Sequence, residues 1–173
     1  MTTLINTTQP AQRTAVILVV GLNRSLLKHA PRLAAFAAKN SVLTLTPPLP
    51  AVTCTVQSSM LTGKPVSGHG IVGNGWYSRE MADVQFWKQS NKLVQGEKVW
   101  HAARRRDPSF TCAKLFWWYN MYADVDFAVT PRPIYKADGR KLPDVHTHPG
   151  GLRDRLQAEL GTFPLFHFWG PAS

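Results

Sequence analysis

Residues 14–46 read TAVILVVGLNRSLLKHAPRLAAFAAKNSVLTLT, and this stretch decides the predicted fold. The continuous apolar run over 14–22 is rich in β-branched residues, which is typical of a central strand covered on both faces of a parallel sheet. Pro31 favours the first turn of a helix, and apolar residues follow it at helical spacing until Asn40. A second short strand is expected over 41–46. Strand, helix and strand in this order predict a right-handed βαβ unit.

Length and composition indicate about one domain with a real core, because the chain has 173 residues of which 44% are hydrophobic. Two widely spaced cysteines, Cys54 and Cys112, exclude a disulfide scaffold and a cysteine zinc finger. No apolar run approaches the roughly 20 residues that span a bilayer. The formal net charge of +10 favours phosphate-bearing partners such as nucleotides, nucleic acid or anionic lipid. Residues 1–13 are expected to be a flexible segment, and without a clear export signal we expect a cytoplasmic protein.

The rest of the chain continues the alternation of helices and strands. Helices are expected over 53–62, 96–106 and 151–160, strands over 110–118 and 163–169, and irregular stretches over 68–75 and 130–150. This order predicts an α/β fold in which helices flank a mostly parallel sheet. Because the chain stops four residues after its last apolar strand, we expect a truncated domain. An edge strand at a natural terminus is the alternative.

The stretch with the clearest chemical signal is residues 47–80, PPLPAVTCTVQSSMLTGKPVSGHGIVGNGWYSRE. It places Thr53 directly after a proline-rich turn, at the predicted start of a helix. A helix N-terminus presents free N–H groups and a partial positive charge, which suit a phosphate group. Threonine is also a common N-cap residue, so position alone leaves a structural role open.

The motif order in this stretch resembles the alkaline phosphatase superfamily, and most closely its type I phosphodiesterase/nucleotide pyrophosphatase family. Thr53 is followed in order by Thr62-Gly63, Pro65, Ser67-Gly68-His69-Gly70-Ile71 and an Asn74 to Tyr77 element. Further segments, FWKQSNKLVQGEKVW, FWWYNMYADVDFAVTPRPIY and ADGRKLPD, are similar to a bacterial subgroup. The resemblance covers residues 15–171. It implies that residues 14–173 form the N-terminal portion of an alkaline-phosphatase-like catalytic domain.

This resemblance implies a metal-dependent hydrolase of phosphodiester or pyrophosphate bonds. Two divalent ions, usually zinc, would activate the Thr53 hydroxyl and stabilise the transferred phosphoryl group. Thr53 would thus be both nucleophile and metal ligand. Asn74 would contact a phosphate oxygen, and so would Gln57 if the helix start is shifted, because family diesterases often carry Asn where this chain has Val56.

Two further residues, His69 and Tyr77, would have structural roles near the site. The chain departs from the family at Val20, which stands where an Asp ligand is usual. The remaining Asp and His ligands belong to the later half of the family domain. We therefore expect the metal pair to need the complete domain, and this chain to be a weakly active or inactive fragment. The alternatives are a basic, non-catalytic protein that binds phosphate groups or nucleic acid, and a gene remnant.

Three other clusters allow more than one interpretation. His146 and His148 alternate along an extended segment and could share a metal with Asp144, or form an exposed histidine pair. The run Phe116–Tyr119 could stack a nucleobase or belong to the core. The arginines 104–106 could favour an anionic partner or complement a helix C-terminus. Substrate identity and oligomeric state stay open.

Overall fold

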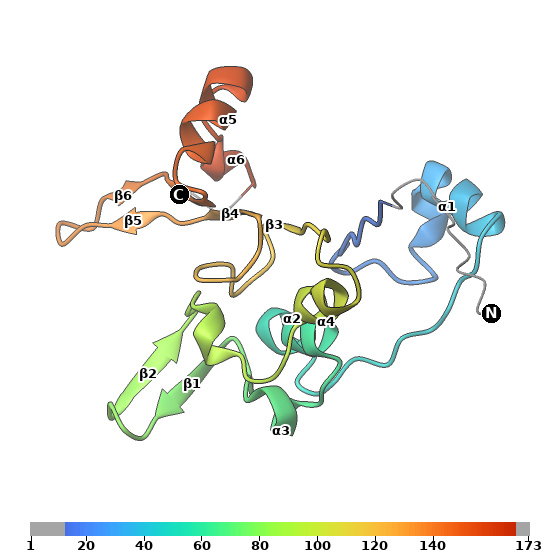
Figure 1. Cartoon of the computed structure of the whole chain (residues 1–173), viewed down its shortest axis with the longest axis horizontal. Helices are drawn as coiled ribbons and strands as arrows, with labels where there is room; N and C mark the ends of the chain where they lie inside the picture. Colours follow the sequence, from blue (N-terminus) through green and yellow to red (C-terminus); the bar gives the residue numbers. More distant parts are fainter. Residues whose placement is uncertain (1–12, 169–173) are drawn as a thin grey trace, which may run out of the picture. The chain divides into compact units, whose positions relative to one another are not determined.

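The computed structural model describes residues 13–168, and the chain divides into two units, residues 1–45 and 46–173 (Figure 1). Residues 1–12 of the predicted flexible segment and Trp169 of the predicted last strand lie outside the described residues.

The first unit contains a short 3₁₀ helix, η1 (Leu27–His29), and one α-helix, α1 (Pro31–Ala38). Pro31 occupies the first turn of α1, where its missing N–H costs no hydrogen bond. At the other end the Asn40 side chain donates from Nδ2 to the carbonyl of Phe36 at 2.8 Å. The helix predicted in this region is therefore confirmed, together with its signals at both ends.

The two strands predicted around α1 are absent from this structure. Residues 14–22 and 41–46 are irregular, and their side chains are mostly exposed, with Ile17 at 80% and Leu43 at 88%. A strand is stable only when a neighbour completes its hydrogen-bond ladder, and no ladder includes either segment within the described part of the chain. The prediction of a βαβ unit is wrong for this structure, because apolar composition does not by itself supply a partner strand.

The second unit contains the remaining helices and all the strands found between residues 13 and 168. In chain order these are α2 (Thr53–Thr62), α3 (Val66–His69), β1 (Gly75–Ser78), β2 (Asp83–Phe86), η2 (Asn91–Leu93), α4 (Val99–Arg106), β3 (Ala113–Leu115), β4 (Phe127–Pro131), β5 (Ile134–Tyr135), β6 (Lys141–Leu142), β7 (Val145–His148), α5 (Leu152–Leu160) and α6 (Leu165–Phe168). α2 has the predicted bounds and ends at Gly63, whose φ of 64° is the left-handed conformation that glycine adopts readily. α4 and α5 begin within a few residues of their predicted starts.

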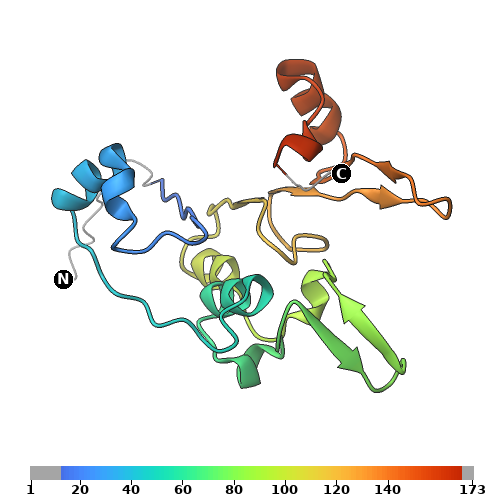
Figure 2. The same ribbon diagram turned by 180° about the vertical axis from the view of Figure 1, so that it is seen from behind.

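The strands form small, mixed sheets. A three-stranded sheet has the order β3-β4-β7, with β3 parallel and β7 antiparallel to β4. β1 with β2, and β5 with β6, form antiparallel hairpins (Figures 1 and 2). The α/β content agrees with the sequence, whereas a mostly parallel sheet is not confirmed. The stretch 130–150, expected to be irregular, contains β5, β6 and β7.

The predicted final strand forms a helical turn instead. α6 (Leu165–Phe168) follows Pro164, and Leu165 is buried. Proline removes a ladder donor from a strand but fits the first turn of a helix, so this proline favours the helix over the strand.

Two hydrophobic clusters hold α2 in place. One contains Cys54 of α2 with Ile71, Val94, Trp118 and Tyr119. The other contains Trp100 of α4, Ala123, Val125 and Ala128, with Leu61 of α2 packed against it. α2 and α4 accordingly lie side by side (Figures 1 and 2). Since both clusters include side chains of α2, the start of this helix has a fixed position in the second unit.

Candidate active site

The start of α2 is capped from a distant loop. Thr53 is the first helical residue and is half-buried, and the preceding Val52 occupies the N-cap position with no polar side chain to offer. The Oδ1 atom of Asn74 accepts a hydrogen bond from the Cys54 N–H at 2.9 Å. Thr53 is thus not the N-cap residue that its position in the sequence left possible. Its hydroxyl is not needed at that position, because Asn74 binds a free N–H of the first turn.

Asn74 also contacts the chain beyond β2. Its backbone carbonyl accepts a hydrogen bond from the N–H of Trp87 at 3.0 Å. One residue therefore joins the start of α2 to the segment that follows the β1–β2 hairpin. The bond from the Cys54 N–H places Asn74 beside the first turn of α2, so Thr53 and Asn74, both selected from the sequence, lie in the same region.

Gln57 lies one turn further along α2 and is buried. Its Oε1 atom accepts a hydrogen bond from the Trp118 N–H at 2.6 Å. The amide oxygen is therefore engaged with the backbone in this structure, and the residue positions Trp118. Sequence reasoning assigned Gln57 to phosphate binding and had no local signal for this partner, which is 61 positions away.

His69 is fully buried beside α2. Its Nε2 atom lies 2.9 Å from Ser59 Oγ, and its Nδ1 atom accepts from the Ile71 N–H at 3.1 Å. This pattern assigns a neutral ring with the proton on Nε2. Burial lowers the pKa of His69 from its ordinary 6.5, which favours the same neutral form. The ring thus ties the glycine-containing loop at Gly70 to α2.

Tyr77 lies on β1 opposite Val84 of β2, and 60% of it is exposed. Its ring therefore belongs to the open face of the hairpin. The structure places Tyr77 only three residues from Asn74 in the chain.

A cleft of about 370 Å³ lies between the two hairpins, and we refer to it as the aromatic cleft. It is lined by Phe86, Trp87, Lys88, Gln89, Ser90, Trp118, Met121, Tyr122, Arg132, Pro133 and Tyr135. Lys92 adds a cation, with its Nζ 5.4 Å from the centre of the Tyr122 ring. The cleft therefore offers flat aromatic side chains together with positive charge.

Two hydrogen bonds link the wall of this cleft to α2, one directly and one through Asn74. Trp118 in its wall is held by Gln57, and Trp87 by Asn74. Of the cleft residues, Trp118 was recognisable in the sequence only as one member of an aromatic run. The other cleft residues had one sequence signal, the adjacent aromatic pair Phe86-Trp87 in the FWKQ segment.

Of the two alternatives for His146 and His148, the metal site is not supported by the described residues. His146 and His148 lie on β7, and burial, Arg132 and His148 together lower the pKa of His146 below its ordinary value. Asp144, the expected third ligand, pairs with Arg153 at 2.9 Å. Within residues 13–168 no three His, Cys, Asp or Glu side chains are grouped to hold a metal ion. The described residues do not fit the two-metal centre implied by the resemblance.

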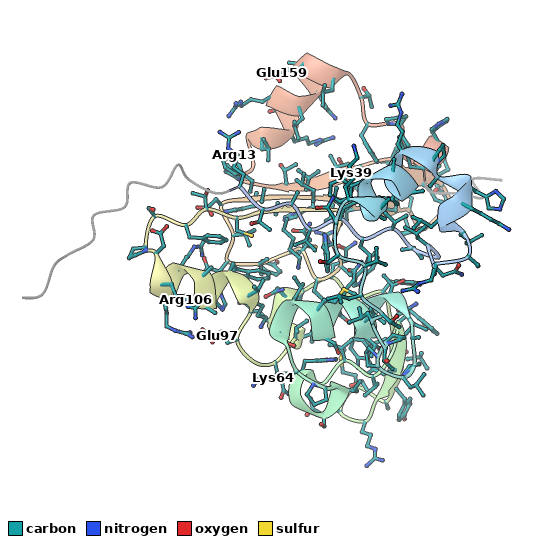
Figure 3. The ribbon with its side chains drawn as sticks, turned by 90° about the vertical axis from the view of Figure 1, so that its right-hand side faces the viewer. Arg13, Lys39, Lys64, Glu97, Arg106 and Glu159 are labelled. Atoms are coloured by element: carbon teal, nitrogen blue, oxygen red, sulfur yellow. The ribbon has the colours of Figure 1, made fainter. Side chains whose placement is uncertain are left out.

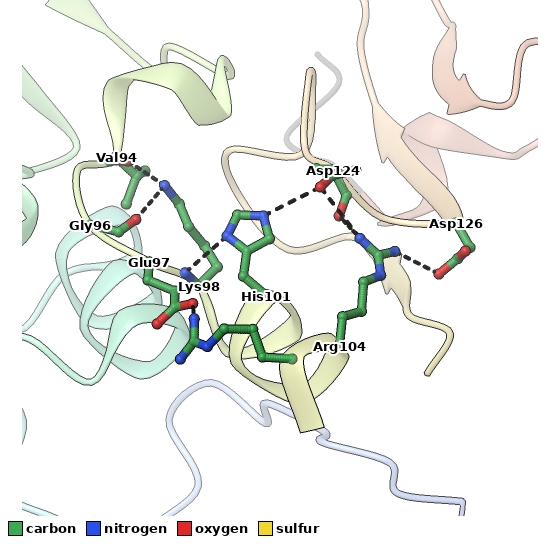
Figure 4. Close-up of polar contacts among 9 residues, drawn as sticks. Val94, Gly96, Glu97, Lys98, His101, Arg104, Asp124 and Asp126 are labelled. Carbon is green, nitrogen blue, oxygen red and sulfur yellow. Dashed lines mark hydrogen bonds and ion pairs between the residues drawn. The ribbon is translucent and has the colours of Figure 1, made fainter. Parts of the chain in front are cut away.

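The arginine run at the end of α4 has mainly structural partners (Figure 4). Arg104 donates from Nη1 to the Asp124 carbonyl and pairs through Nη2 with Asp126, both at 2.9 Å. Arg105 pairs with Glu97. Two of the three arginines are therefore neutralised within the fold, and Arg106 is exposed.

Comparison with known proteins identifies the class to which this α/β chain belongs. The model of the family "Type I phosphodiesterase / nucleotide pyrophosphatase" matches residues 14–173. The chain belongs to this family, which is a member of the alkaline phosphatase superfamily. The resemblance inferred from the order of motifs between Thr53 and Tyr77 is thereby confirmed. No curated protein and no solved structure matches the chain.

The family is one of phosphodiester and pyrophosphate hydrolases, and it implies a phosphodiester or nucleotide substrate. Its members are typically metal-dependent. Among the described residues, no helix is both long enough and apolar enough to cross a bilayer.

Proposed function

We propose that this chain carries the nucleophile of a metal-dependent hydrolase of phosphodiester or pyrophosphate bonds, and that Thr53 is this nucleophile. The observation that supports it most strongly is the double contact of Asn74. One residue links the first turn of α2 to Trp87 in the aromatic cleft. We propose that a substrate bound in the cleft extends its phosphate toward this helix N-terminus, which suits an anionic group.

Asn74 and the first turn of α2 would hold the phosphate. The Asn74 oxygen is occupied by the Cys54 N–H, whereas its Nδ2 group carries donors of the kind that a phosphate oxygen accepts. The positive end of the helix dipole favours a dianionic or anionic group beside Thr53. Gln57 would act as a positioning residue, because its oxygen holds Trp118.

The aromatic cleft would take the organic part of the substrate. The faces of Trp87 and Tyr122 offer stacking surfaces for a planar base, a contact that contributes roughly 1–3 kcal/mol in other binding sites. Lys88 and Arg132 in the same wall would attract negative charge. A nucleotide-like compound has both properties, so we propose a nucleotide or dinucleotide as the substrate class.

The metal pair would need ligands from outside the described residues. Val20 stands where the resemblance implies a carboxylate, and residues 13–168 contain no group of three His, Cys, Asp or Glu side chains that could hold a metal ion. We propose that this chain does not hold the metal pair by itself and is therefore weakly active or inactive. The complete catalytic domain of the family would supply the missing ligands.

The proposal is tested by turnover and by binding. Hydrolysis of bis-p-nitrophenyl phosphate is measured with and without zinc, and AMP binding is followed by quenching of tryptophan fluorescence. We expect any zinc-dependent turnover to fall at least tenfold in Thr53→Ala, and AMP binding to weaken in Trp87→Ala. Ser67→Ala, an exposed hydroxyl of α3, serves as the control and should change neither. Unchanged turnover in Thr53→Ala would remove the role assigned to that hydroxyl.

A non-catalytic role in binding nucleic acid is the second candidate. The net charge of +10 and the cations of the aromatic cleft favour it. Binding to single-stranded nucleic acid with a steep salt dependence, and with no effect of zinc, would support this role. Absence of both activities would support a gene remnant.

A further inference from the structure

The front of the chain is cationic without any acidic residue. Residues 1–79 contain seven Lys and Arg and no Asp or Glu, and the first carboxylate of the whole sequence is Glu80. The described part of the first unit carries Arg13, Arg24, Lys28, Arg32 and Lys39, together with His29. Figure 3 labels two of these side chains, Arg13 and Lys39. Because the unit has no carboxylate, none of these cations has an acidic partner within it.

The same unit exposes large apolar side chains. α1 has no buried residue, and Phe36 is 65% exposed. Leu26 and Leu33 are also exposed, as are most apolar residues of 14–22 and 41–45. Arg32 directly precedes Leu33, and Lys39 follows Phe36 by three positions. Apolar and cationic groups are therefore interleaved on α1 rather than separated into different regions.

Exposed apolar side chains beside cations allow a choice between two common anionic partners, nucleic acid and an anionic lipid bilayer. A nucleic acid attracts cations through its phosphates but gains little from exposed leucine and phenylalanine on a helix. The interface of an anionic bilayer accepts both, because apolar side chains enter the acyl boundary while Lys and Arg remain at the headgroups. Long cationic side chains can also extend from a shallowly buried helix to reach the headgroups.

We infer that residues 13–45 form a surface that docks on an anionic lipid bilayer. Leu33 and Phe36 of α1 enter the interface, and Arg32 and Lys39 bind lipid phosphates. The attachment is peripheral, in keeping with the short length of α1. It would hold the second unit near a membrane without using any residue of the aromatic cleft.

Vesicle flotation with the full chain tests this docking, since bound protein rises with the vesicles whereas aggregated protein sinks. We expect flotation with vesicles of equal parts phosphatidylglycerol and phosphatidylcholine, little with phosphatidylcholine alone, and release by high salt. Lys39→Gln should lower the partition about fivefold, the typical contribution of one cation near such a surface. Phe36→Ser should lower it about tenfold or more.

Two matched variants in the second unit are the controls. Lys136→Gln removes an exposed cation and Met81→Ser an exposed apolar side chain, and neither should change flotation. Because α1 has no buried side chain, Phe36→Ser should fold as the parent does, which circular dichroism checks.

Three results would overturn the inference. The first is equal flotation with neutral and anionic vesicles, since this would show apolar adhesion without charge recognition. The second is no flotation with either vesicle. The third is flotation unaffected by Phe36→Ser but abolished by competing duplex DNA, which would assign the surface to nucleic acid.

Discussion

Asn74 Oδ1 accepts a hydrogen bond from the backbone N–H of Cys54 at 2.9 Å, although the two residues are twenty positions apart. The bond replaces a local N-cap, which Val52 cannot provide. It also holds Cys54, the residue next to Thr53, against the loop that contains Asn74. The position of the proposed nucleophile thus depends on a residue outside its own helix.

Asn74→Ala should destabilise the second unit by about 1–2 kcal/mol, because it leaves a free N–H in the first turn of α2. Urea denaturation followed by tryptophan fluorescence measures this change. The control is Asn40→Ala, which removes an exposed amide at the end of α1 and should cost less than about 0.5 kcal/mol. Equal losses of stability in the two variants would contradict the capping role of Asn74.

Gln57→Leu removes the amide oxygen that accepts from the buried Trp118 N–H, and it should lower the free energy of unfolding by about 1–3 kcal/mol. Since Trp118 is part of the aromatic cleft, the emission maximum of the folded protein should also shift. Gln95→Leu alters an exposed glutamine and is the matched control. A stable variant with unchanged emission would show that this hydrogen bond does not position Trp118.

Gly75→Ala tests the close approach within the first hairpin. A Cβ atom at position 75 would collide with the ring of Phe86, its cross-strand partner. We expect a loss of about 1–3 kcal/mol, the usual cost of overpacking. Gly150→Ala, with open space around the added methyl group, should be near neutral. In a double-mutant cycle Phe86→Ala should recover part of the loss, and strict additivity would contradict the contact.

Lys114 should make stability rise with pH. It is buried, its Nζ donates to the Tyr119 carbonyl at 2.7 Å, and burial chiefly lowers its pKa from 10.5 to about 7. The unfolded chain therefore binds more protons than the folded chain between about pH 7 and 10.5, so the free energy of unfolding rises across this window. Lys114→Met should flatten the rise measured by urea denaturation at neutral and alkaline pH.

The exposed Lys92 provides the control for that measurement. Lys92→Met should keep the slope of the parent protein, because this side chain lies at the surface. An unchanged slope in Lys114→Met would mean that Lys114 keeps an ordinary pKa in the folded state.

Arg104 should stabilise the contact between α4 and residues 124–126. Arg104→Met removes its bonds to the Asp124 carbonyl and the Asp126 carboxylate, and we expect a loss of about 1–2 kcal/mol. Arg106→Met, at an exposed position of the same helix, should change stability by less than about 0.5 kcal/mol. The difference is measured by comparing the thermal unfolding midpoints of the two variants with that of the parent protein.

The Asp126 carboxyl adds a pH dependence to this contact. Its hydrogen bond from the Cys112 N–H, followed by Arg104, lowers the pKa of Asp126 below its ordinary 3.8. The stabilisation is therefore present above about pH 3.8 and is lost as the pH falls through the lower folded value. Asp126→Asn should weaken this acid-dependent loss, and an unchanged acid transition would contradict the assignment.

Local signals predicted the helices well. Pro31 and Asn40 flank α1, and Gly63 ends α2 where its positive φ is needed. Such signals act within a few residues, so the sequence shows them directly. The same is true of the ordered motifs from Thr53 to Tyr77, from which we inferred the family that the family model confirms. The strand predictions failed at 14–22, 41–46 and 163–169, because pairing depends on distant segments that composition does not reveal.

The sequence by itself determined the family, the bounds of α2 and the position of Thr53 at its start, since each depends on residue types at short and fixed spacing. Only the tertiary structure decided what surrounds Thr53. The cap from Asn74, the bond between Gln57 and Trp118, and the cleft between the two hairpins all join residues that are far apart in the chain. Their geometry depends on how α2 packs into the two hydrophobic clusters, and packing is a property of the folded chain rather than of any local pattern.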